Sequence, residues 1–266
     1  MFHAKNGRLQ LPGGKMDYIC FGSGKKILVM IPGVGDGLKT VKGMALPFAV
    51  LYRTLAGDFS VYVFSRRADL APHTGTRDMA DDLNLALEAL ALENADVVGV
   101  SQGGMIAQWL ALDHPDKVNR LVLTVTLSRP NPTVCDVVRR WMEMAKRGDY
   151  KGIMMDTAER SYSPGYLRKA RIQYKALGNL GRPKSFDRFL IQAESCLTHD
   201  ACAELPRIAC PTLVIGGTED RIVTGRASEE IAARISGSIL KMYDGLGHGL
   251  YEEEPDFLKQ VKAFCL

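Results

Sequence analysis

Ser101 is the first residue whose surroundings suggest chemistry, because it lies at the centre of the run 99–103 (GVSQG). The apolar residues 95–100 predict a buried strand before it, and residues 102–112 predict a helix after it. A tight turn of this kind presents the serine at the amino terminus of a helix, where the backbone favours negative charge. The flanking glycines leave room for a strained backbone. The pattern predicts a serine nucleophile, and the alternative is a turn that simply uses small residues.

His248 is the residue best placed to act as the base that such a nucleophile needs. A serine hydroxyl is a weak nucleophile until a base takes its proton. Of the histidines at positions 3, 73, 114, 199 and 248, only His248 follows the last predicted strand. It lies in a glycine-rich loop, residues 245–249 (GLGHG), which suits an imidazole at the edge of a sheet. His114 is more simply a cationic cap at the end of a helix, and we expect His3 and His73 to be exposed.

Apolar strand patterns alternate with helix patterns over most of the chain. Strand patterns cover residues 18–21, 26–31, 60–65, 95–100, 121–126, 211–216 and 238–243, and helix patterns cover residues 46–56, 76–92, 102–112, 227–235 and 255–265. The strands are apolar throughout, as is typical of a sheet covered on both faces. Strands that alternate with helices indicate parallel pairing. The sequence therefore predicts an α/β fold with a mostly parallel central sheet flanked by helices.

The alternation stops in the second half of the chain, where residues 131–205 are predicted to form a helical cap insertion. Residues 1–130 and 206–266 then form the core. A single α/β domain runs to roughly 200–250 residues, so a chain of 266 residues fits one domain with an insertion. Large side chains of the insertion either line a substrate site or form its own small core; they are Trp141, Met142, Met144, Tyr162, Tyr166, Tyr174, Phe186 and Phe189.

Two segments show a resemblance to a known family. Residues 98–105 (VGVSQGGM) form the turn around the serine, and residues 115–123 (PDKVNRLVL) lead into the next strand. With the order of elements along the chain, they resemble the α/β-hydrolase superfamily, in which G-x-S-x-G marks the nucleophile turn. The resemblance is closest to capped esterases, enol-lactonases and C–C bond hydrolases. It extends over essentially the whole chain, and its motifs specify the superfamily better than the substrate.

The resemblance implies a catalytic triad in the chain order serine, acid, histidine. Asp220 matches the position of the acid, in a G-x-x-D-x-x-V pattern with Gly217 and Val223 after a predicted strand. Its carboxylate is expected to fix the tautomer of the His248 ring and to stabilise the protonated ring. Glu219 is the rival for this role and is otherwise a solvated loop carboxylate. We favour Asp220, because its position fits the family's loop better.

The resemblance also implies two backbone N–H donors that form an oxyanion hole. One donor belongs to the residue after the nucleophile, Gln102, and the other lies in the loop after the strand 26–31. The family usually has His-Gly-x in that loop, with the third residue as donor. This chain has Pro32-Gly33-Val34, so Val34 is the expected donor and Pro32 departs from the pattern. A backbone donor survives this change, which affects instead the hydrogen bonds that hold the loop.

The sequence predicts no cofactor and no metal site. Cys196, His199 and Cys202 have a C-x2-H-x2-C spacing, with Cys210 as the nearest fourth ligand for zinc. A helix end that contains small thiols is the simpler interpretation. Six cysteines in a chain without a signal peptide are expected to be reduced. There is no phosphate-binding loop, and the glycines at 33, 35 and 37 lack the final spacing of a dinucleotide-binding motif.

The charge of the chain is nearly balanced, with 34 basic and 30 acidic residues. This balance does not favour a nucleic-acid partner. One stretch is rich in basic residues, which either select an anionic substrate or form a solvated helix face; they are Arg168, Lys169, Arg171, Lys175, Arg182, Lys184 and Arg188. The apolar runs are too short to span a bilayer. We expect a cytoplasmic protein with a small-molecule substrate and no membrane partner; a homo-oligomer stays open.

The leading hypothesis is a serine hydrolase that cleaves an ester, lactone or related acyl bond through an acyl-enzyme on Ser101. The alternatives on the same fold are C–C bond hydrolysis, cofactor-free perhydrolysis and a lyase reaction. The triad does not separate them, because the pocket decides the substrate. A non-catalytic ligand receptor is the remaining alternative, and the intact set of Ser101, Asp220 and His248 argues against it.

Overall fold

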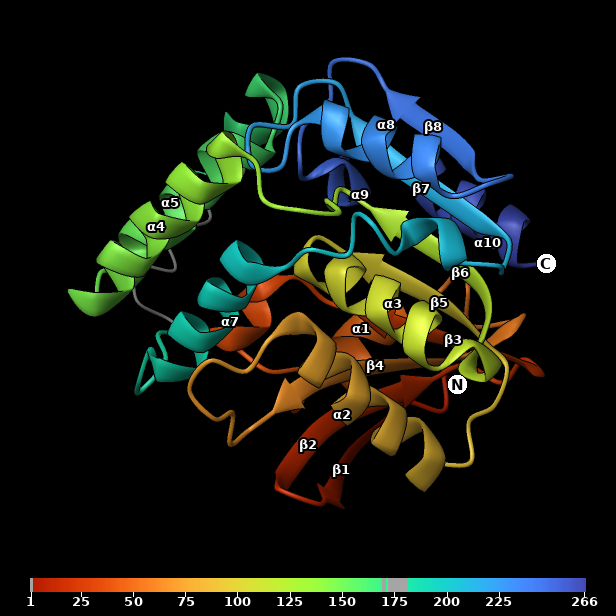
Figure 1. Ribbon diagram of the computed structural model, residues 1–266. Coiled ribbons are helices and arrows are strands. Elements are labelled where there is room, and N and C mark those ends of the chain that lie inside the picture. Colours follow the sequence, from red (N-terminus) through yellow and green to blue (C-terminus); the bar gives the residue numbers. More distant parts are fainter. Residues whose placement is uncertain (1, 169–170, 172–180) are drawn as a thin grey trace.

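One sheet organises the described part of the chain, with eight strands in the order β1-β2-β4-β3-β5-β6-β7-β8 (Figure 1). The structure is a computed structural model that describes residues 2–168, 171 and 181–266. The strands are β1 (Lys5–Leu11), β2 (Gly14–Phe21), β3 (Lys26–Ile31), β4 (Phe59–Arg67), β5 (Ala95–Val100), β6 (Val118–Thr124), β7 (Thr212–Gly217) and β8 (Ile239–Tyr243). Strands β3 to β8 pair in parallel, so their carboxyl ends meet at one edge. The predicted fold class is confirmed.

β1 is the strand that the sequence patterns did not predict, and the pattern at residues 18–21 covers only the second half of β2. β1 pairs antiparallel with β2, and β2 pairs antiparallel with β4. β1 has the sequence KNGRLQL, and only its last residue, Leu11, is buried. An edge strand of this kind lacks the apolar run by which buried strands are recognised. The other strands lie within a few residues of their predicted ranges.

Helices cover both faces of the sheet and enclose two apolar cores. They are α1 (Ala45–Leu51), α2 (Thr76–Ala89), α3 (Gln102–Asp113), α8 (Gly225–Arg234), α9 (Leu250–Glu253) and α10 (Asp256–Cys265). On one face, α2, α3 and α8 bury apolar side chains such as Leu83, Leu110 and Ile231. On the other face, α1 and α10 bury Ala49 and Phe257. Because both faces lose water, the central strands are held rigidly and their carboxyl ends form a stable edge.

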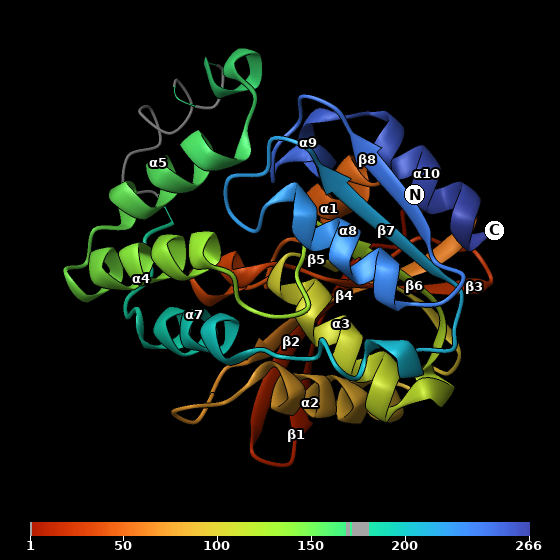
Figure 2. The same cartoon turned by 45° about the horizontal axis from the view of Figure 1, so that its top comes forward.

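Helices α4 (Pro132–Lys146), α5 (Tyr150–Ser161) and α7 (Asp187–Thr198) lie between β6 and β7, and we call them the inserted helices. Figures 1 and 2 both show them together on one side of the molecule. Val137 of α4 and Phe189 of α7 share an apolar cluster with Met105 of α3 and Ile222 after β7. The inserted helices therefore pack against the elements that follow β5 and β7.

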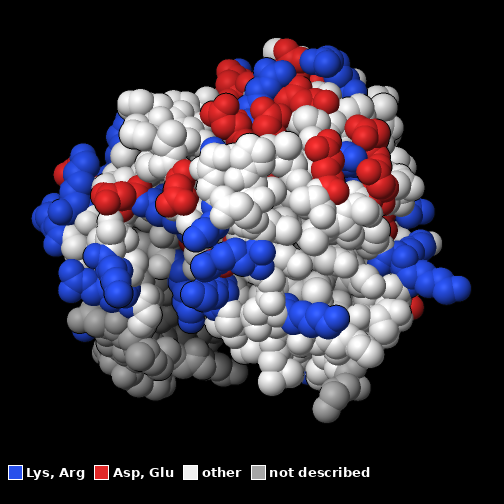
Figure 3. All heavy atoms as spheres, turned by 90° about the horizontal axis from the view of Figure 1, so that it is seen from below, with Lys and Arg blue, Asp and Glu red and all other residues white. Residues whose placement is uncertain are grey.

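The surface carries charges of both signs. On the face seen in Figure 3, the basic side chains lie in separate groups with broad uncharged areas between them. No helix among the described residues is long and apolar enough to cross a membrane. The cytoplasmic location and the absence of a nucleic-acid partner stay predictions.

Candidate active site

Ser101 connects β5 to α3 in a conformation that L-residues rarely adopt, with φ 55° and ψ −121°. A Cβ on Gly103 would lie 1.9 Å from the carbonyl oxygen of Ile31 in β3. A Cβ on Gly99 would lie 2.6 Å from the Cα atom of Gly104 in α3. The two glycines therefore permit the close approach of strand and helix that makes the turn so tight. The strained serine and the need for both glycines agree with the sequence pattern.

His248 and Asp220 are hydrogen-bonded although 28 residues separate them. The Nδ1 atom of the His248 ring lies 2.8 Å from Oδ2 of Asp220, and both side chains are buried. The other oxygen of Asp220 accepts the backbone N–H groups of Ile222 and Val223, at 2.8 and 3.0 Å. Burial alone would raise the pKa of Asp220, but the His248 ring and these hydrogen bonds lower it below its usual value. Asp220 is therefore an ionised group that orients the ring.

Glu219, the rival carboxylate, does not take this place. Its side chain is exposed, while the side chain of Asp220 is buried. The backbone N–H of Glu219 donates to the carbonyl oxygen of Leu246, at 2.9 Å. The loop after β7 and the loop that bears His248 are thus joined through their backbones.

The loop of His248 is also tied to the end of α5. The backbone N–H of Gly249 donates to the carbonyl oxygen of Ser161, at 2.9 Å. The hydroxyl of Tyr162 donates to Oε2 of Glu252 in α9, at 2.6 Å. The imidazole is therefore held from two sides, by the loop after β7 and by the inserted helices.

A cavity of about 370 Å³, which we call the main cavity, is lined by both Ser101 and His248. Val34 and the insertion residues Trp141 and Phe189 contribute to the same wall. Among the described residues, the Ser101 hydroxyl and the His248 ring share this wall without a hydrogen bond between them. Catalytic hydrogen bonds are often long in enzymes without substrate and tighten when substrate binds. The structure thus brings the three predicted side chains to one site. The hydrogen bond between His248 and Asp220 is formed, and the one between His248 and Ser101 is not.

Two of the large side chains of the insertion have both expected roles. Trp141 and Phe189 are buried in the apolar cluster of the inserted helices and also line the main cavity. Met142 and Phe186 pack against that cluster. Tyr174 lies outside the described residues.

Val34 and Gln102, the expected oxyanion donors, each begin a helical segment. The short helix η1 (Val34–Gly37) follows β3, and α3 begins at Gln102. The first N–H groups of a helical segment have no acceptor within it. Gly33 allows the loop to approach Ser101, because a Cβ there would lie 3.3 Å from the Cβ atom of Ser101. Gln102 directly follows Ser101 in the chain, and Val34 follows the glycine that approaches Ser101 and lines the same cavity.

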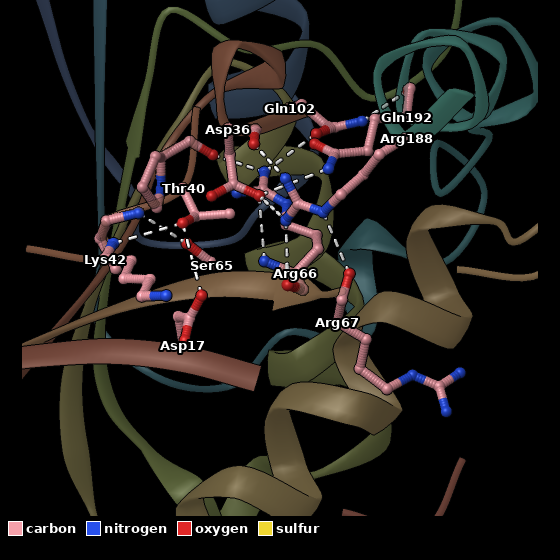
Figure 4. Close-up of polar contacts among 12 residues, drawn as sticks. Asp17, Asp36, Thr40, Lys42, Ser65, Arg66, Arg67, Gln102, Arg188 and Gln192 are labelled. Atoms are coloured by element: carbon pink, nitrogen blue, oxygen red, sulfur yellow. Dashed lines mark hydrogen bonds and ion pairs between the residues drawn. The ribbon is translucent and has the colours of Figure 1, made fainter. Parts of the chain in front are cut away.

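Arg66, at the end of β4, belongs to a buried polar network that the sequence patterns did not reveal (Figure 4). Its guanidinium donates to the carbonyl oxygen of Pro32 and to Oε1 of Gln102, the latter at 3.0 Å. Burial lowers the pKa of Arg66 to about 10, and the neighbouring Asp36 opposes this shift. The family's histidine is absent at Pro32, and Arg66 instead binds the backbone of the loop at that residue.

Asp36 and Arg188 extend this network to the inserted helices. The Oδ2 atom of Asp36 accepts the backbone N–H of Arg66 at 3.1 Å and the side chain of Gln192 at 3.3 Å. The same oxygen accepts the guanidinium of Arg188 in α7, which also donates to the carbonyl oxygens of Arg66 and Arg67, at 2.9 and 3.1 Å. Helix α7 is thus bonded directly to the loop that contains Val34.

The described basic residues of the insertion do not line the main cavity. Lys169 and Lys175 lie outside the described residues, and none of the other five lines the cavity with Ser101. Arg171 pairs with Glu159 at 2.7 Å. Arg188 fits neither alternative from the sequence, because it is largely buried against Asp36.

The described residues contain no group of three or more histidine, cysteine or acidic side chains placed to hold a metal ion. His199 is buried with Nδ1 2.9 Å from Oγ1 of Thr76, and Sγ of Cys202 lies 3.4 Å from Oε1 of Glu230. Because these two side chains have different partners, the C-x2-H-x2-C spacing agrees with the simpler interpretation, a helix end that contains small thiols.

The family of the α/β hydrolase fold matches residues 26–255 of this chain. The chain belongs to this family. The predicted superfamily and the prediction of a hydrolase are confirmed at this level. A 2-hydroxymuconate semialdehyde hydrolase of Pseudomonas sp. (strain CF600) is 31% identical to this α/β-hydrolase over 255 residues, which are 90% of this chain and 89% of the relative.

Two further proteins, one compared by sequence and one by structure, are also similar to this chain. RutD of Caulobacter sp. (strain K31), whose name describes a carbamate hydrolase, is 29% identical over 203 residues, 72% of each chain. The crystal structure of the enol-lactonase from Burkholderia xenovorans LB400 has a TM-score of 0.82 at 19% identity, covering 97% of this chain and 99% of that chain. At this identity, the structural likeness shows the fold alone.

Proposed function

We propose that this α/β-hydrolase cleaves an ester, lactone or related acyl bond of a small molecule, with Ser101 as nucleophile and His248 as base. The observation that best supports this proposal is the wall shared by Ser101 and His248, with the imidazole held by Asp220. Nucleophile, base and orienting carboxylate in this relation suit acyl transfer, which needs only these side chains and water.

The reaction proceeds in two halves. The hydroxyl oxygen of Ser101 attacks the carbonyl carbon while His248 takes its proton, and the N–H groups of Val34 and Gln102 stabilise the oxyanion. When the bond to the leaving oxygen breaks, His248 gives the proton to the departing alcohol and an acyl-enzyme remains. Water then attacks the acyl group, His248 takes a proton from the water and returns it to the serine oxygen, and the acid is released.

We infer that the inserted helices act as the cap expected for residues 131–205. Trp141, Phe189 and Ile153 line the main cavity from this side. Apolar side chains over the nucleophile exclude water, which strengthens the hydrogen bonds to the developing oxyanion. The cap also decides which substrates fit.

Ser101→Ala tests the proposal, with a short p-nitrophenyl ester as substrate. We expect the loss of turnover to be on the order of 10³-fold or more. A fluorophosphonate should label Ser101 in the wild-type protein, as mass spectrometry of the labelled peptide would show. Wild-type turnover in Ser101→Ala would refute the role of this serine. Tight ligand binding without turnover and without labelling would favour the receptor alternative.

C–C bond hydrolysis is the second candidate, because the relative from Pseudomonas sp. (strain CF600) is 31% identical over 90% of this chain. In this reaction Ser101, or water activated by His248, adds to a carbonyl carbon, the bond from that carbon to its neighbouring carbon breaks, and His248 gives its proton to the carbon that leaves. A panel of short esters, dienone-type acids and perhydrolysis assays separates the candidates by kcat/KM. A dienone-type acid that exceeds every ester by more than tenfold would replace the first proposal.

A further inference from the structure

A second cavity of about 400 Å³ adjoins the main cavity, and we call it the side cavity. Its wall comes from strands β3, β4 and β5 and from helices α1, α9 and α10. Tyr166 of the insertion contributes to it as well. No step of the proposed reaction uses this space.

The two cavities adjoin each other beside Ser101. They share five lining residues, Pro32, Gly33, Phe48, Tyr251 and Glu252. Ser101 lines the main cavity, and the residue before it, Val100, lines the side cavity. An arm of a few carbon atoms on a molecule whose carbonyl carbon lies at Ser101 would therefore reach the boundary between the two cavities.

The lining of the side cavity is mainly apolar, with Met30, Val63 and Leu258 among its residues. Its charged lining residues in the described part of the chain are Glu252 and Glu254, without a lysine or arginine.

Both carboxylates already have partners. Glu252 accepts the hydroxyl of Tyr162 at 2.6 Å, and Glu254 accepts the backbone N–H of Asp256 at 2.9 Å. An anionic group placed here would be repelled by the carboxylates and would lose its hydration without compensation. The wall therefore disfavours an anionic occupant, and its apolar side chains favour a hydrocarbon one.

We propose that the side cavity binds a neutral hydrocarbon arm of the substrate while the scissile carbonyl group lies at Ser101. This inference rests on the proposed function, because Ser101 fixes the position of the carbonyl. Small-molecule sites usually have volumes of roughly 300–1,000 Å³. The main and side cavities, at about 370 and 400 Å³, together reach the upper part of that range. The substrate is therefore an ester-type molecule with an extended apolar arm, larger than a compact lactone or acetate.

Two leucines of α1 provide a matched pair for the test. Leu51 lines the side cavity and is 62% exposed. Leu46 is equally exposed, at 62%, and is absent from the lining of both cavities. Because both side chains lie at the surface, Leu51→Lys and Leu46→Lys should fold alike. Only the first variant places a charge on the wall of the side cavity.

The experiment measures kcat/KM for two series of esters below the concentrations at which they aggregate. One series is p-nitrophenyl acetate to decanoate, which lengthens the acyl group, and the other is methyl to decyl acetate, which lengthens the alcohol. In one of the two series, we expect kcat/KM to rise by up to about fourfold for each methylene that enters the cavity. That series shows which half of the substrate occupies the side cavity.

In Leu51→Lys, the ratio of kcat/KM for the longest to the shortest ester should fall at least fivefold, while the rate with the shortest ester is kept. Leu46→Lys should keep the wild-type ratio. Leu258→Trp, which fills the side cavity from α10, should act like Leu51→Lys. Flat profiles in both series, or equal ratios in the two lysine variants, would overturn this inference while short esters still report on Ser101. If no ester is turned over, the proposed function fails and this inference falls with it.

Discussion

The imidazole of His248 is held by the buried carboxylate of Asp220 and not by the neighbouring carboxylate of Glu219. The distance from Nδ1 to Oδ2 of Asp220 is 2.8 Å, and the side chain of Glu219 is exposed. Two adjacent carboxylates in one loop therefore have different surroundings. Because their surroundings differ, substitutions of Asp220 and Glu219 should have different effects on activity.

Asp220→Asn should lower kcat for a short ester by about 10³- to 10⁴-fold, because the amide no longer fixes the catalytic tautomer of His248 or stabilises the protonated ring. Glu219→Gln should keep kcat within about twofold, because surface changes of this kind rarely disturb a site. Steady-state kinetics with one p-nitrophenyl ester measures both variants. A larger loss in Glu219→Gln than in Asp220→Asn would exchange the two roles.

Ser101→Gly should be more stable than Ser101→Ala, although both variants lack the hydroxyl group of Ser101. A residue with φ 55° and ψ −121° is strained unless it is glycine, at a cost of about 1–3 kcal/mol. Glycine also loses more backbone freedom on folding, which offsets roughly 0.5–1 kcal/mol of that gain. We expect a net difference in unfolding free energy of about 1 kcal/mol, measured by urea denaturation. Equal or greater stability of Ser101→Ala would show that the turn is relaxed.

Local patterns made Ser101 and the central sheet predictable from the sequence. β5 (Ala95–Val100) is an uninterrupted apolar strand, and the glycines around the serine follow from the tightness of the turn. β1 (Lys5–Leu11) escaped prediction because an edge strand needs no apolar run. Asp220 was chosen over Glu219 by family resemblance, since no local pattern separates two adjacent carboxylates in a loop.

The polar network around Asp36 could not be predicted from local patterns. Asp36 and Arg188 are separated by 152 residues, and 30 residues separate Asp36 from Arg66. The one usable signal was an arginine, Arg66, that directly follows a buried apolar strand, since a charge in that place needs a partner. Arg188 lies within a basic stretch, where its sequence neighbours suggested a solvated side chain.

Arg188→Gln should lower kcat more than it changes KM, because Arg188 acts through the loop that contains Val34. Loss of the guanidinium leaves Asp36 buried with fewer partners and lets this loop shift. A small misplacement of catalytic groups costs up to about 10²-fold in rate, so we expect a fall in kcat on the order of 10- to 100-fold. The unfolding free energy should fall by about 3 kcal/mol, as for other broken buried pairs.

Arg182→Gln is the matched control for this prediction, because Arg182 is an exposed arginine of the same insertion. It should keep both kcat and stability. Arg188→Lys should recover part of the stability but little of kcat, because lysine keeps the charge and cannot make the several directed hydrogen bonds of the guanidinium. A loss of stability in Arg188→Gln with unchanged kcat would limit this arginine to a structural role.

His199 should make the fold sensitive to acid. Burial lowers the pKa of His199 to about 4 from 6.5, and its ring is bonded to Thr76. Between these values the unfolded chain binds a proton that the folded chain does not, so stability is lost as the pH falls from 6.5 towards 4. The two pKa values correspond to a loss of roughly 3 kcal/mol.

His199→Gln keeps a hydrogen-bonding group near Thr76 and removes the titration, so the difference in unfolding free energy between wild type and variant should shrink as the pH falls. Urea denaturation at several pH values from 7 to 4 measures this difference. His73→Gln is the control, because that side chain is 81% exposed, and it should keep the wild-type slope. Parallel curves for wild type and His199→Gln would mean that the buried imidazole is protonated as easily in the folded protein as in the unfolded chain. In that case other groups, such as Asp220 beside His248, would dominate acid unfolding.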